Sequence, residues 1–103
     1  MNIGIDIQNI PEFKKSYKRT GEEFLQKIFT KKELNCCKRA RDRDMEYLCG
    51  RFCAKEAAIK AGVIGIGEWQ KIEVIGDKSQ FSNFQFSLSH SGDYCVAVVV
   101  SAL

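Results

Sequence analysis

The stretch RFCAKEAAIK, residues 51–60, has the composition of an α-helix, because it contains three Ala and neither Pro nor Gly. Successive residues of a helix turn by about 100°, and this spacing places an apolar stripe around Phe52. The other members of the stripe are Met45, Leu48, Cys49 and Ile59. Glu56 falls inside the stripe and Lys60 lies at its edge. We therefore expect a helix over about 44–61 with a carboxylate on its buried side.

The chain before this helix is expected to hold one strand and several short helices. Residues 2–8, NIGIDIQ, alternate strictly, with three isoleucines on one face and Asp6 on the other, as in a half-buried strand. A helix start then follows at Asn9–Pro11, and a second short helix is expected over residues 22–29. Thr30 and Glu33 form a capping box for a helix over about 30–38.

The chain after the long helix is expected to form the rest of a sheet. Gly62 ends the helix, and three strands follow over residues 72–75, 84–88 and 94–100, the last apolar on both faces like a central strand. Residues 89–93, SHSGD, form a tight connection. The order predicts a single α+β domain over residues 1–103, a small antiparallel sheet with the long helix packed on one face and short N-terminal helices.

Composition favours a cytoplasmic protein. No apolar run is long enough to span a bilayer, and the N-terminus lacks the basic region of a signal peptide. The cysteines are odd in number and form no C-x-x-C, which favours reduced thiols: Cys36, Cys37, Cys49, Cys53 and Cys95. Cys49 and Cys53 stand one helical turn apart, so half of a metal site is the alternative there.

Charge is uneven along the chain. Residues 1–43 hold eleven Lys or Arg and six Asp or Glu, a balance of +5, whereas residues 44–103 hold five and seven, a balance of −2. The basic half could meet an acidic partner or nucleic acid, or it could be a solvated helical face.

Glu56 is the sharpest chemical clue, because a carboxylate removed from water needs a partner. It could be neutral, pair with Lys60, or bind a metal. If the non-isoleucine face of the first strand meets the long helix, Asp6 and Glu56 converge, and two carboxylates suit Mg²⁺ bound beside substrate phosphates. Lys60 would then face a phosphate. His90 is either a hydrogen-bonding loop residue or a phosphate contact.

Five blocks, in this order, span nearly the whole chain: GIDI (4–7), GRFCAKEAAIKA (50–61), GIG (65–67), IEV (72–74) and SLSHSGDYCVAVV (87–99). In content and order they resemble the holo-[acyl-carrier-protein] synthases, the small bacterial 4′-phosphopantetheinyl transferases. The pattern RFxAKEAxxKA is a specific signature of these enzymes, and SxSHS supports it.

The resemblance implies a Mg²⁺-dependent transfer of the phosphopantetheine arm of coenzyme A to a serine of an acyl or peptidyl carrier protein, with release of adenosine 3′,5′-bisphosphate. It implies that Asp6 and Glu56 hold the magnesium and that these two residues and Lys60 are catalytic. It assigns the coenzyme A site to Arg51, Lys60, Gly65, Gly67, His90 and Ser91. It further implies a homotrimer with sites between subunits, a role in fatty acid biosynthesis and lipid metabolism, and no nucleic-acid or membrane partner.

Direct attack by a serine hydroxyl on the β-phosphate requires charge neutralisation, in-line positioning and removal of a proton. Either a metal-bound water or Glu56 could take the proton. Glu12 stands where a basic residue is usual, and the segment between Val74 and Ser87 is short. A non-catalytic relative that binds carrier protein or coenzyme A is therefore the alternative. A nucleic-acid-binding module is the third hypothesis, and the sequence lacks an aromatic-rich basic motif for it.

Overall fold

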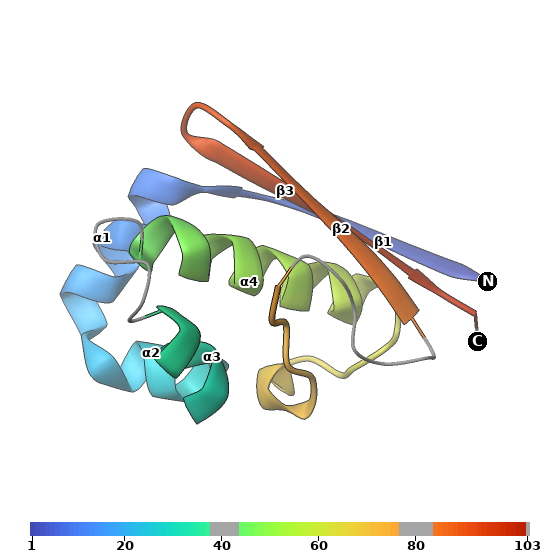
Figure 1. Ribbon diagram of the computed structural model, residues 1–103, viewed down its shortest axis with the longest axis horizontal. Coiled ribbons are helices and arrows are strands. Elements are labelled where there is room, and N and C mark those ends of the chain that lie inside the picture. The colour runs from blue at the N-terminus through green and yellow to red at the C-terminus, as the bar shows by residue number, and fades with distance from the viewer. Residues whose placement is uncertain (38–43, 77–83, 103) are drawn as a thin grey trace.

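A three-stranded antiparallel sheet and one long helix form the centre of the fold. The structure, a computed structural model, describes residues 1–37, 44–76 and 84–102. Its elements are β1 (Asn2–Asn9), α1 (Ile10–Thr20), α2 (Glu22–Ile28), α3 (Lys31–Cys37), α4 (Asp44–Lys60), the 3₁₀ helix η2 (Trp69–Lys71), β2 (Phe84–Ser91) and β3 (Tyr94–Ser101). Helix α4 lies along one face of the sheet, and α2, α3 and η2 lie on the side of α4 that faces away from the sheet (Figure 1). The predicted α+β architecture is confirmed.

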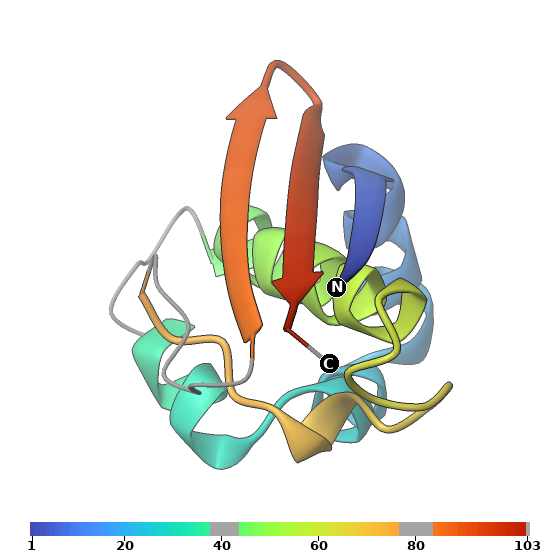
Figure 2. The same ribbon diagram turned by 90° about the vertical axis from the view of Figure 1, so that its right-hand side faces the viewer.

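Strand β3 is central in the order β1-β3-β2, as Figure 2 shows. Its Cys95, Ala97 and Val99 are buried against α4, and the valines between them lie half-buried on the opposite face. The apolar character of both faces therefore predicted the position of this strand correctly. None of the described helices is long and apolar enough to cross a lipid bilayer.

The hairpin between β2 and β3 is tighter than predicted. Ser91 pairs with Tyr94, so the turn consists of Gly92 and Asp93 alone. Gly92 has φ +57°, the left-handed conformation that two-residue hairpin turns require. The predicted connection over 89–93 is wrong in its extent, because residues 89–91 are the last three of β2.

Residues 72–75 do not form the predicted strand; they follow η2 as irregular chain. Ile72 and Val74 are buried. Their backbone is paired with side chains instead of a strand. The carbonyl of Ile72 accepts from Lys55 and the amide of Val74 donates to Glu33. A period of two predicts burial but does not supply a neighbouring strand.

The predicted caps fix the starts of two helices. The side chain of Asn9 accepts from the amide of Glu12 at 2.9 Å and begins α1. Thr30 and Glu33 form both bonds of the capping box before α3. Lys38, the expected end of that helix, lies outside the described residues, as does most of the short segment before Ser87. The sequence also predicts an exposed basic connector over 38–43 and a turn over 76–79; the connector and all of the turn but Gly76 lie outside the described residues.

The sheet packs against small residues of α4 and not against its large apolar side chains. Cys53 and Ala57 are fully buried, and a Cβ on Gly4 of β1 would lie 2.0 Å from the carbonyl oxygen of Ala57. The predicted stripe is only partly the buried side: Leu48 and Cys49 are buried, as predicted, whereas Phe52 and Glu56 are half-buried. Helix and sheet approach so closely that only small groups fit between them. The large side chain of Phe52 therefore turns toward aromatic rings of α1 and η2.

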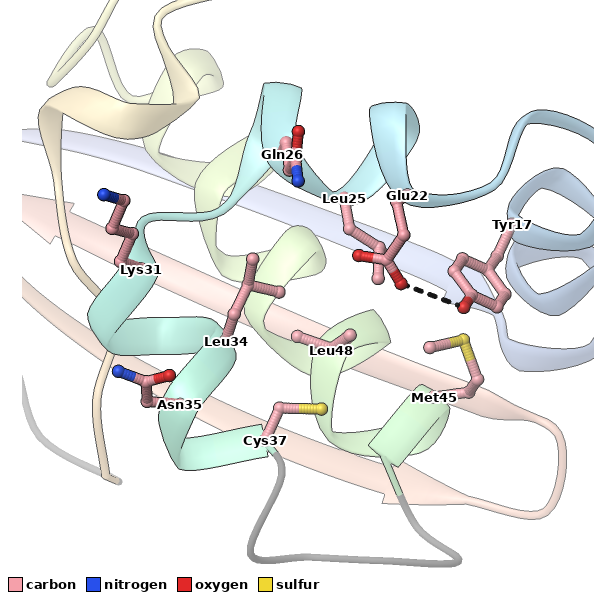
Figure 3. Close-up of a pocket in the computed structure, with 10 residues that line it drawn as sticks. All are labelled: Tyr17, Glu22, Leu25, Gln26, Lys31, Leu34, Asn35, Cys37, Met45 and Leu48. Atoms are coloured by element: carbon pink, nitrogen blue, oxygen red, sulfur yellow. Dashed lines mark hydrogen bonds between the residues drawn. The ribbon is translucent and has the colours of Figure 1, made fainter.

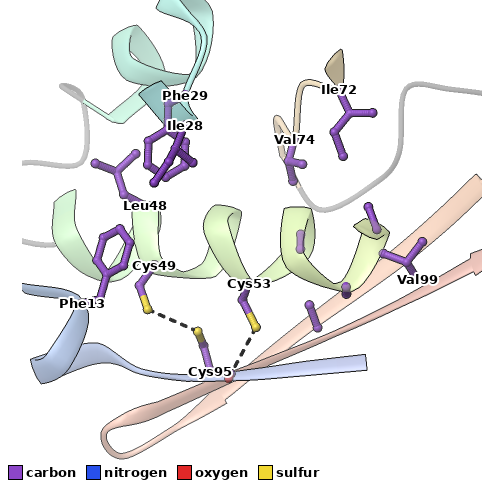
Figure 4. Close-up of a cluster of buried hydrophobic side chains, with 14 of the residues drawn as sticks. Phe13, Ile28, Phe29, Leu48, Cys49, Cys53, Ile72, Val74, Cys95 and Val99 are labelled. Carbon is purple, nitrogen blue, oxygen red and sulfur yellow. Dashed lines mark hydrogen bonds between the residues drawn. The ribbon is translucent and has the colours of Figure 1, made fainter. Parts of the chain in front are cut away.

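Three thiols lie between α4 and the sheet, as Figure 4 shows. The Sγ atoms of Cys49 and Cys95 are 3.6 Å apart, and Cys53 donates to the carbonyl oxygen of Asp6 at 3.2 Å. Hydrogen bonding to Cys95 and burial raise the pKa of Cys49 and of Cys53, which keeps both as thiols. None of the five cysteines, all of which lie in the described part of the chain, forms a disulfide. The cluster fills the narrow space that larger side chains could not enter.

Candidate active site

Asp6 lies on the helix-facing side of β1. The strand alternates with Ile5 facing outward at 60% exposure, so Asp6 turns inward and is only 9% exposed. Its Oδ2 accepts from Gln8 Nε2 at 2.7 Å, and its Oδ1 accepts from Lys60 Nζ at 3.0 Å. The non-isoleucine face of the strand therefore meets the long helix, which was the condition for Asp6 to approach the residues of that helix.

Lys60 is the last residue of α4, and its ammonium group lies over the first strand. Besides Asp6, it donates to the carbonyl oxygen of Ile5 at 3.0 Å. Its side chain is 54% exposed. Because an ammonium group has three N–H donors and two are used within the described residues, one is left for a ligand.

Glu56 precedes Lys60 by one helical turn, which places their Cβ atoms about 5–6 Å apart on neighbouring positions of the helix surface. Its Oε1 accepts from the indole Nε1 of Trp69 at 3.2 Å. Among the described residues, Lys60 forms its ion pair with Asp6 and not with Glu56, the partner that helical spacing offered. We call Asp6, Glu56 and Lys60 the carboxylate–lysine cluster.

The two carboxylates of this cluster have the donor chemistry that Mg²⁺ prefers. Within the described part of the chain, Oε2 of Glu56 has no hydrogen-bond partner, so it is available to a cation. No three His, Cys, Asp or Glu side chains in that part form a group that could hold a metal. Magnesium commonly takes only one or two carboxylates from a protein when substrate phosphates complete its shell, so the donor chemistry of Asp6 and Glu56 suits the ion.

Arg51 lies on another side of α4. It precedes Glu56 by five residues, which corresponds to about 140° around the helix. Its guanidinium carbon stacks 4.1 Å above the ring of Tyr47, and its Nη2 donates to the carbonyl oxygen of Gly76 at 2.8 Å. Arg51 is 6% exposed, and its Nε has no partner among the described residues. Within one chain it does not join the carboxylate–lysine cluster.

His90 and Ser91 lie at the end of β2, beside the hairpin, and both are exposed. The Nδ1 of His90 lies 3.6 Å from Glu46 Oε1 at the start of α4. Strands β1 and β2 flank β3 on opposite sides, so Asp6 and His90 lie toward opposite edges of the sheet. One chain therefore keeps two groups of predicted site residues apart.

Gly65 and Gly67 lie in the loop that follows α4. The amide of Gly65 donates to Glu68 Oε1 at 2.7 Å, and Gly67 has φ +80°, where a glycine is favoured. Ile66 between them is 92% exposed. The loop begins directly after Lys60, the cationic end of the carboxylate–lysine cluster.

A buried ion pair that the sequence did not predict lies next to Glu56 along α4. Lys55 Nζ lies 2.7 Å from Glu33 Oε1, and both side chains are fully buried. The ammonium group also donates to three backbone carbonyls, those of Ile28, Trp69 and Ile72. Burial lowers the pKa of Lys55, and the Glu33 carboxylate opposes that shift. We call Lys55, Glu33 and these carbonyls the Lys55 hub.

Two signals in the sequence bear on the hub. The capping box had identified Glu33, and its bond to the amide of Thr30 is present. Lys55 belongs to the signature RFxAKEAxxKA, but nothing local shows that residues 28, 69 and 72 surround it. Trp69, which bonds Glu56, was missed for the same reason.

A cavity of about 340 Å³ opens between α1, α2, α3 and the start of α4, as Figure 3 shows. Its walls include Leu25, Leu34 and Met45, and Tyr17 donates to Glu22 at its rim at 3.3 Å. The negative charge of Glu22 raises the pKa of Tyr17. None of the predicted site residues lines this cavity.

Residues 2–99 match the family model of the 4′-phosphopantetheinyl transferase superfamily. The holo-[acyl-carrier-protein] synthase of Chloroherpeton thalassium is 35% identical over 97% of this chain and 96% of its own length. A crystal structure of the holo-[acyl-carrier-protein] synthase from Neisseria meningitidis superposes with a TM-score of 0.86 at 27% identity, over 99% of this chain and 98% of that one. A crystal structure of a holo-(acyl-carrier-protein) synthase from Bacillus anthracis in complex with CoA (3′,5′-ADP) superposes with a TM-score of 0.80 at 34% identity. The match covers 97% of this chain and 94% of that one.

The sheet, the long helix and the signature on it thus define a member of the 4′-phosphopantetheinyl transferase superfamily. Its relatives place it further: the chain is an enzyme of the holo-[acyl-carrier-protein] synthase family. The resemblance seen in the sequence is confirmed.

Proposed function

We propose that this enzyme transfers the 4′-phosphopantetheine arm of coenzyme A to a serine of an apo acyl carrier protein. The serine oxygen forms a bond to the β-phosphorus of coenzyme A, the bond to the bridging oxygen breaks, and adenosine 3′,5′-bisphosphate leaves. The serine gives up its proton. The observation that carries the proposal is the carboxylate–lysine cluster, held where β1 meets the end of α4.

Each member of the cluster has a role in this reaction. Lys60 would stabilise negative charge on the diphosphate with its remaining N–H donor, since a fixed cation acts most strongly where charge develops. Asp6 and Glu56 would hold Mg²⁺, which when bound supplies further neutralisation of the diphosphate. The bond from Lys60 to Asp6 keeps the cation and one carboxylate in register before any ligand arrives.

Coenzyme A would also contact the other predicted residues, namely Arg51, Gly65, Gly67, His90 and Ser91. Because Asp6 and His90 lie toward opposite edges of one sheet, we propose that neighbouring copies in a homotrimer complete each site. The outer face of β1 supports this, since it leaves Ile3, Ile5 and Ile7 exposed by 66, 60 and 63%. Exposed apolar patches of this kind commonly mark protein interfaces.

The carrier protein would dock on the basic surface of α1. Lys14, Lys15 and Lys18 are exposed there, and a positive surface steers an acidic partner toward the site. Glu12, also exposed, is the acidic exception on that helix. We propose that the chain acts as one domain, in the cytoplasm and in fatty acid biosynthesis.

The test is direct. The protein is incubated with coenzyme A, Mg²⁺ and an apo acyl carrier protein of the same organism, and the carrier is weighed by mass spectrometry. Gain of the phosphopantetheine arm is expected with the wild type and not with Glu56→Gln, which should remain folded. No gain with any carrier of that organism would sink the proposal, and coenzyme A binding without transfer would favour a non-catalytic relative.

A further inference from the structure

We propose that Trp69 is a positioning residue for Glu56. Its indole N–H fixes the carboxylate through which the carboxylate–lysine cluster would take a divalent cation. The inference rests on the proposed function and deepens it. Trp69 is the single tryptophan of the chain, which makes the idea unusually easy to test.

The contact itself joins a donor-only group to a carboxylate. Trp69 Nε1 lies 3.2 Å from Glu56 Oε1, and both side chains are half-buried. The indole is neutral and can only donate, so it orients the carboxylate without cancelling its charge. A lysine in the same place would occupy the cation position. Lys60, one turn along the helix, is bonded to Asp6 instead.

Trp69 is held at both its backbone and its ring. Its carbonyl oxygen accepts from the buried Nζ of Lys55 at 2.6 Å. Its ring packs against Phe52, with centroids 6.4 Å apart and planes at 47°. Lys55 and Glu56 are consecutive, so neighbouring residues of α4 contact the backbone and the indole of one tryptophan. The Lys55 hub thereby holds the residue that orients the candidate cation ligand.

The segment around Trp69 is tied to its surroundings on either side. Glu68 accepts from the amide of Gly65 at 2.7 Å through Oε1 and from the amide of Lys71 at 3.0 Å through its carbonyl. Gln70 Nε2 donates to the carbonyl oxygen of Phe29 at the end of α2 at 3.1 Å. The 3₁₀ helix η2 is therefore a fixed platform for the indole. Groups that fix a metal ligand from outside commonly contribute 10–100-fold, roughly, to metal affinity.

The decisive variant is Trp69→Phe, which keeps an aromatic ring beside Phe52 but removes the N–H donor. Mn²⁺ binding in the presence of coenzyme A, followed by the electron paramagnetic resonance signal of the free ion, should weaken by about tenfold or more. The KM for coenzyme A should change less than twofold, roughly, if only the carboxylate is affected. Thermal unfolding of each variant is measured alongside.

Phe52→Leu is the matched control, because it removes volume from the same ring contact without touching Glu56. It should bind Mn²⁺ like the wild type. Wild-type affinity in Trp69→Phe, or equal weakening in both variants, would overturn the proposal by showing that the indole only fills space.

A second measurement needs no change at Trp69. Because Mn²⁺ is paramagnetic, its binding at Glu56 should quench the tryptophan fluorescence of the wild type in a saturable manner, and Glu56→Gln should lose this quenching. Absence of quenching in the wild type would contradict the proposal. Transfer to the carrier is scored separately. A wild type that binds Mn²⁺ without transfer tells against the reaction, whereas a wild type that transfers while Trp69→Phe binds Mn²⁺ normally tells against Trp69 alone.

Discussion

Two lysines five residues apart on α4 carry the same charge in opposite settings. Lys55 is fully buried, and its ammonium group has four acceptors within 3.1 Å, more than its three N–H donors can fill. Lys60 is 54% exposed and has two acceptors, Asp6 and the carbonyl of Ile5. Each is paired with one carboxylate. The difference lies in the N–H donors that remain for a ligand: Lys55 has none, and Lys60 has one.

A saturated buried cation can only hold structure together. The Lys55 hub joins α2, α3, η2 and residues 72–74 to α4, and it offers nothing to solvent. The unsaturated cation at Lys60 has a spare donor and access to solvent, as a group that meets a diphosphate must have. Four substitutions test this difference between a structural and an available lysine. Two change the lysines themselves, and two change residues that position their carboxylate partners.

The largest effect is expected for Lys55→Met. Removing one partner of a buried ion pair commonly lowers the free energy of unfolding by about 3–5 kcal/mol, because the remaining charge on Glu33 is then buried without a counter-ion. Urea unfolding measures the loss. Adding Glu33→Gln should restore part of it, since the orphaned charge is then gone. A loss below about 1 kcal/mol would mean that the hub is not a stabilising centre.

Lys60→Met should lower the activity and leave the stability nearly unchanged. The kcat/KM for carrier modification should fall by about 10²–10³-fold, the usual effect of losing one group that stabilises developing charge. The free energy of unfolding should change by no more than about 1 kcal/mol, because the pair with Asp6 is largely exposed on the lysine side. Lys71→Met is the control: it breaks the exposed pair with Glu68 and should alter neither quantity strongly.

Gly4→Ala should disturb the site by moving β1. The new Cβ would lie 2.0 Å from the backbone oxygen of Ala57, so the strand must shift away from α4 and carry Asp6 with it. We expect a loss of about 1–3 kcal/mol in unfolding free energy together with reduced transfer. Gly50→Ala, on α4 with 4.0 Å to the nearest side chain, should be neutral or stabilising. Equal results for the two variants would contradict the close approach.

The smallest effect is expected for Thr30→Ala, which removes a hydrogen bond to the amide of Glu33, the carboxylate residue of the Lys55 hub. The Thr30 hydroxyl accepts from the Glu33 amide at 3.2 Å and donates to Glu73 at 2.5 Å. Its loss should lower the free energy of unfolding by about 1 kcal/mol with transfer unchanged. Thr20→Ala removes an exposed bond to the Ser16 carbonyl and should cost less than about 0.5 kcal/mol. Calorimetry of both variants makes the comparison.

Short-range patterns predicted much of the fold correctly. The alternation of β1, the caps at Asn9 and Thr30 and the extent of α4 all depend on residues within one or two turns of each other. The signature on α4 likewise identified the family. Such features follow from backbone geometry and from hydrogen bonds that close within a few residues.

Other expectations failed where distant segments decide the outcome. The large apolar side chains predicted a buried stripe centred on Phe52, but Gly4 allows the sheet to approach the small residues beside that stripe, and Phe52 itself is half-buried. Residues 72–75 have the period of a strand, yet their backbone is paired with Lys55 and Glu33. Helical spacing made Lys60 a possible ion-pair partner for Glu56, but Lys60 pairs with Asp6 of β1 instead.

The amino-acid order was therefore sufficient for the secondary structure of most elements, for the family, and for the identities of Asp6, Glu56 and Lys60 as candidates. Tertiary structure alone decided the partners: which lysine is saturated, which is available, and which residue orients Glu56. The physical reason is that the role of a charged side chain depends on the hydrogen-bond partners that surround it in the folded protein. The acceptors around Lys55 come from positions 28, 33, 69 and 72, and only folding brings them within reach of one ammonium group.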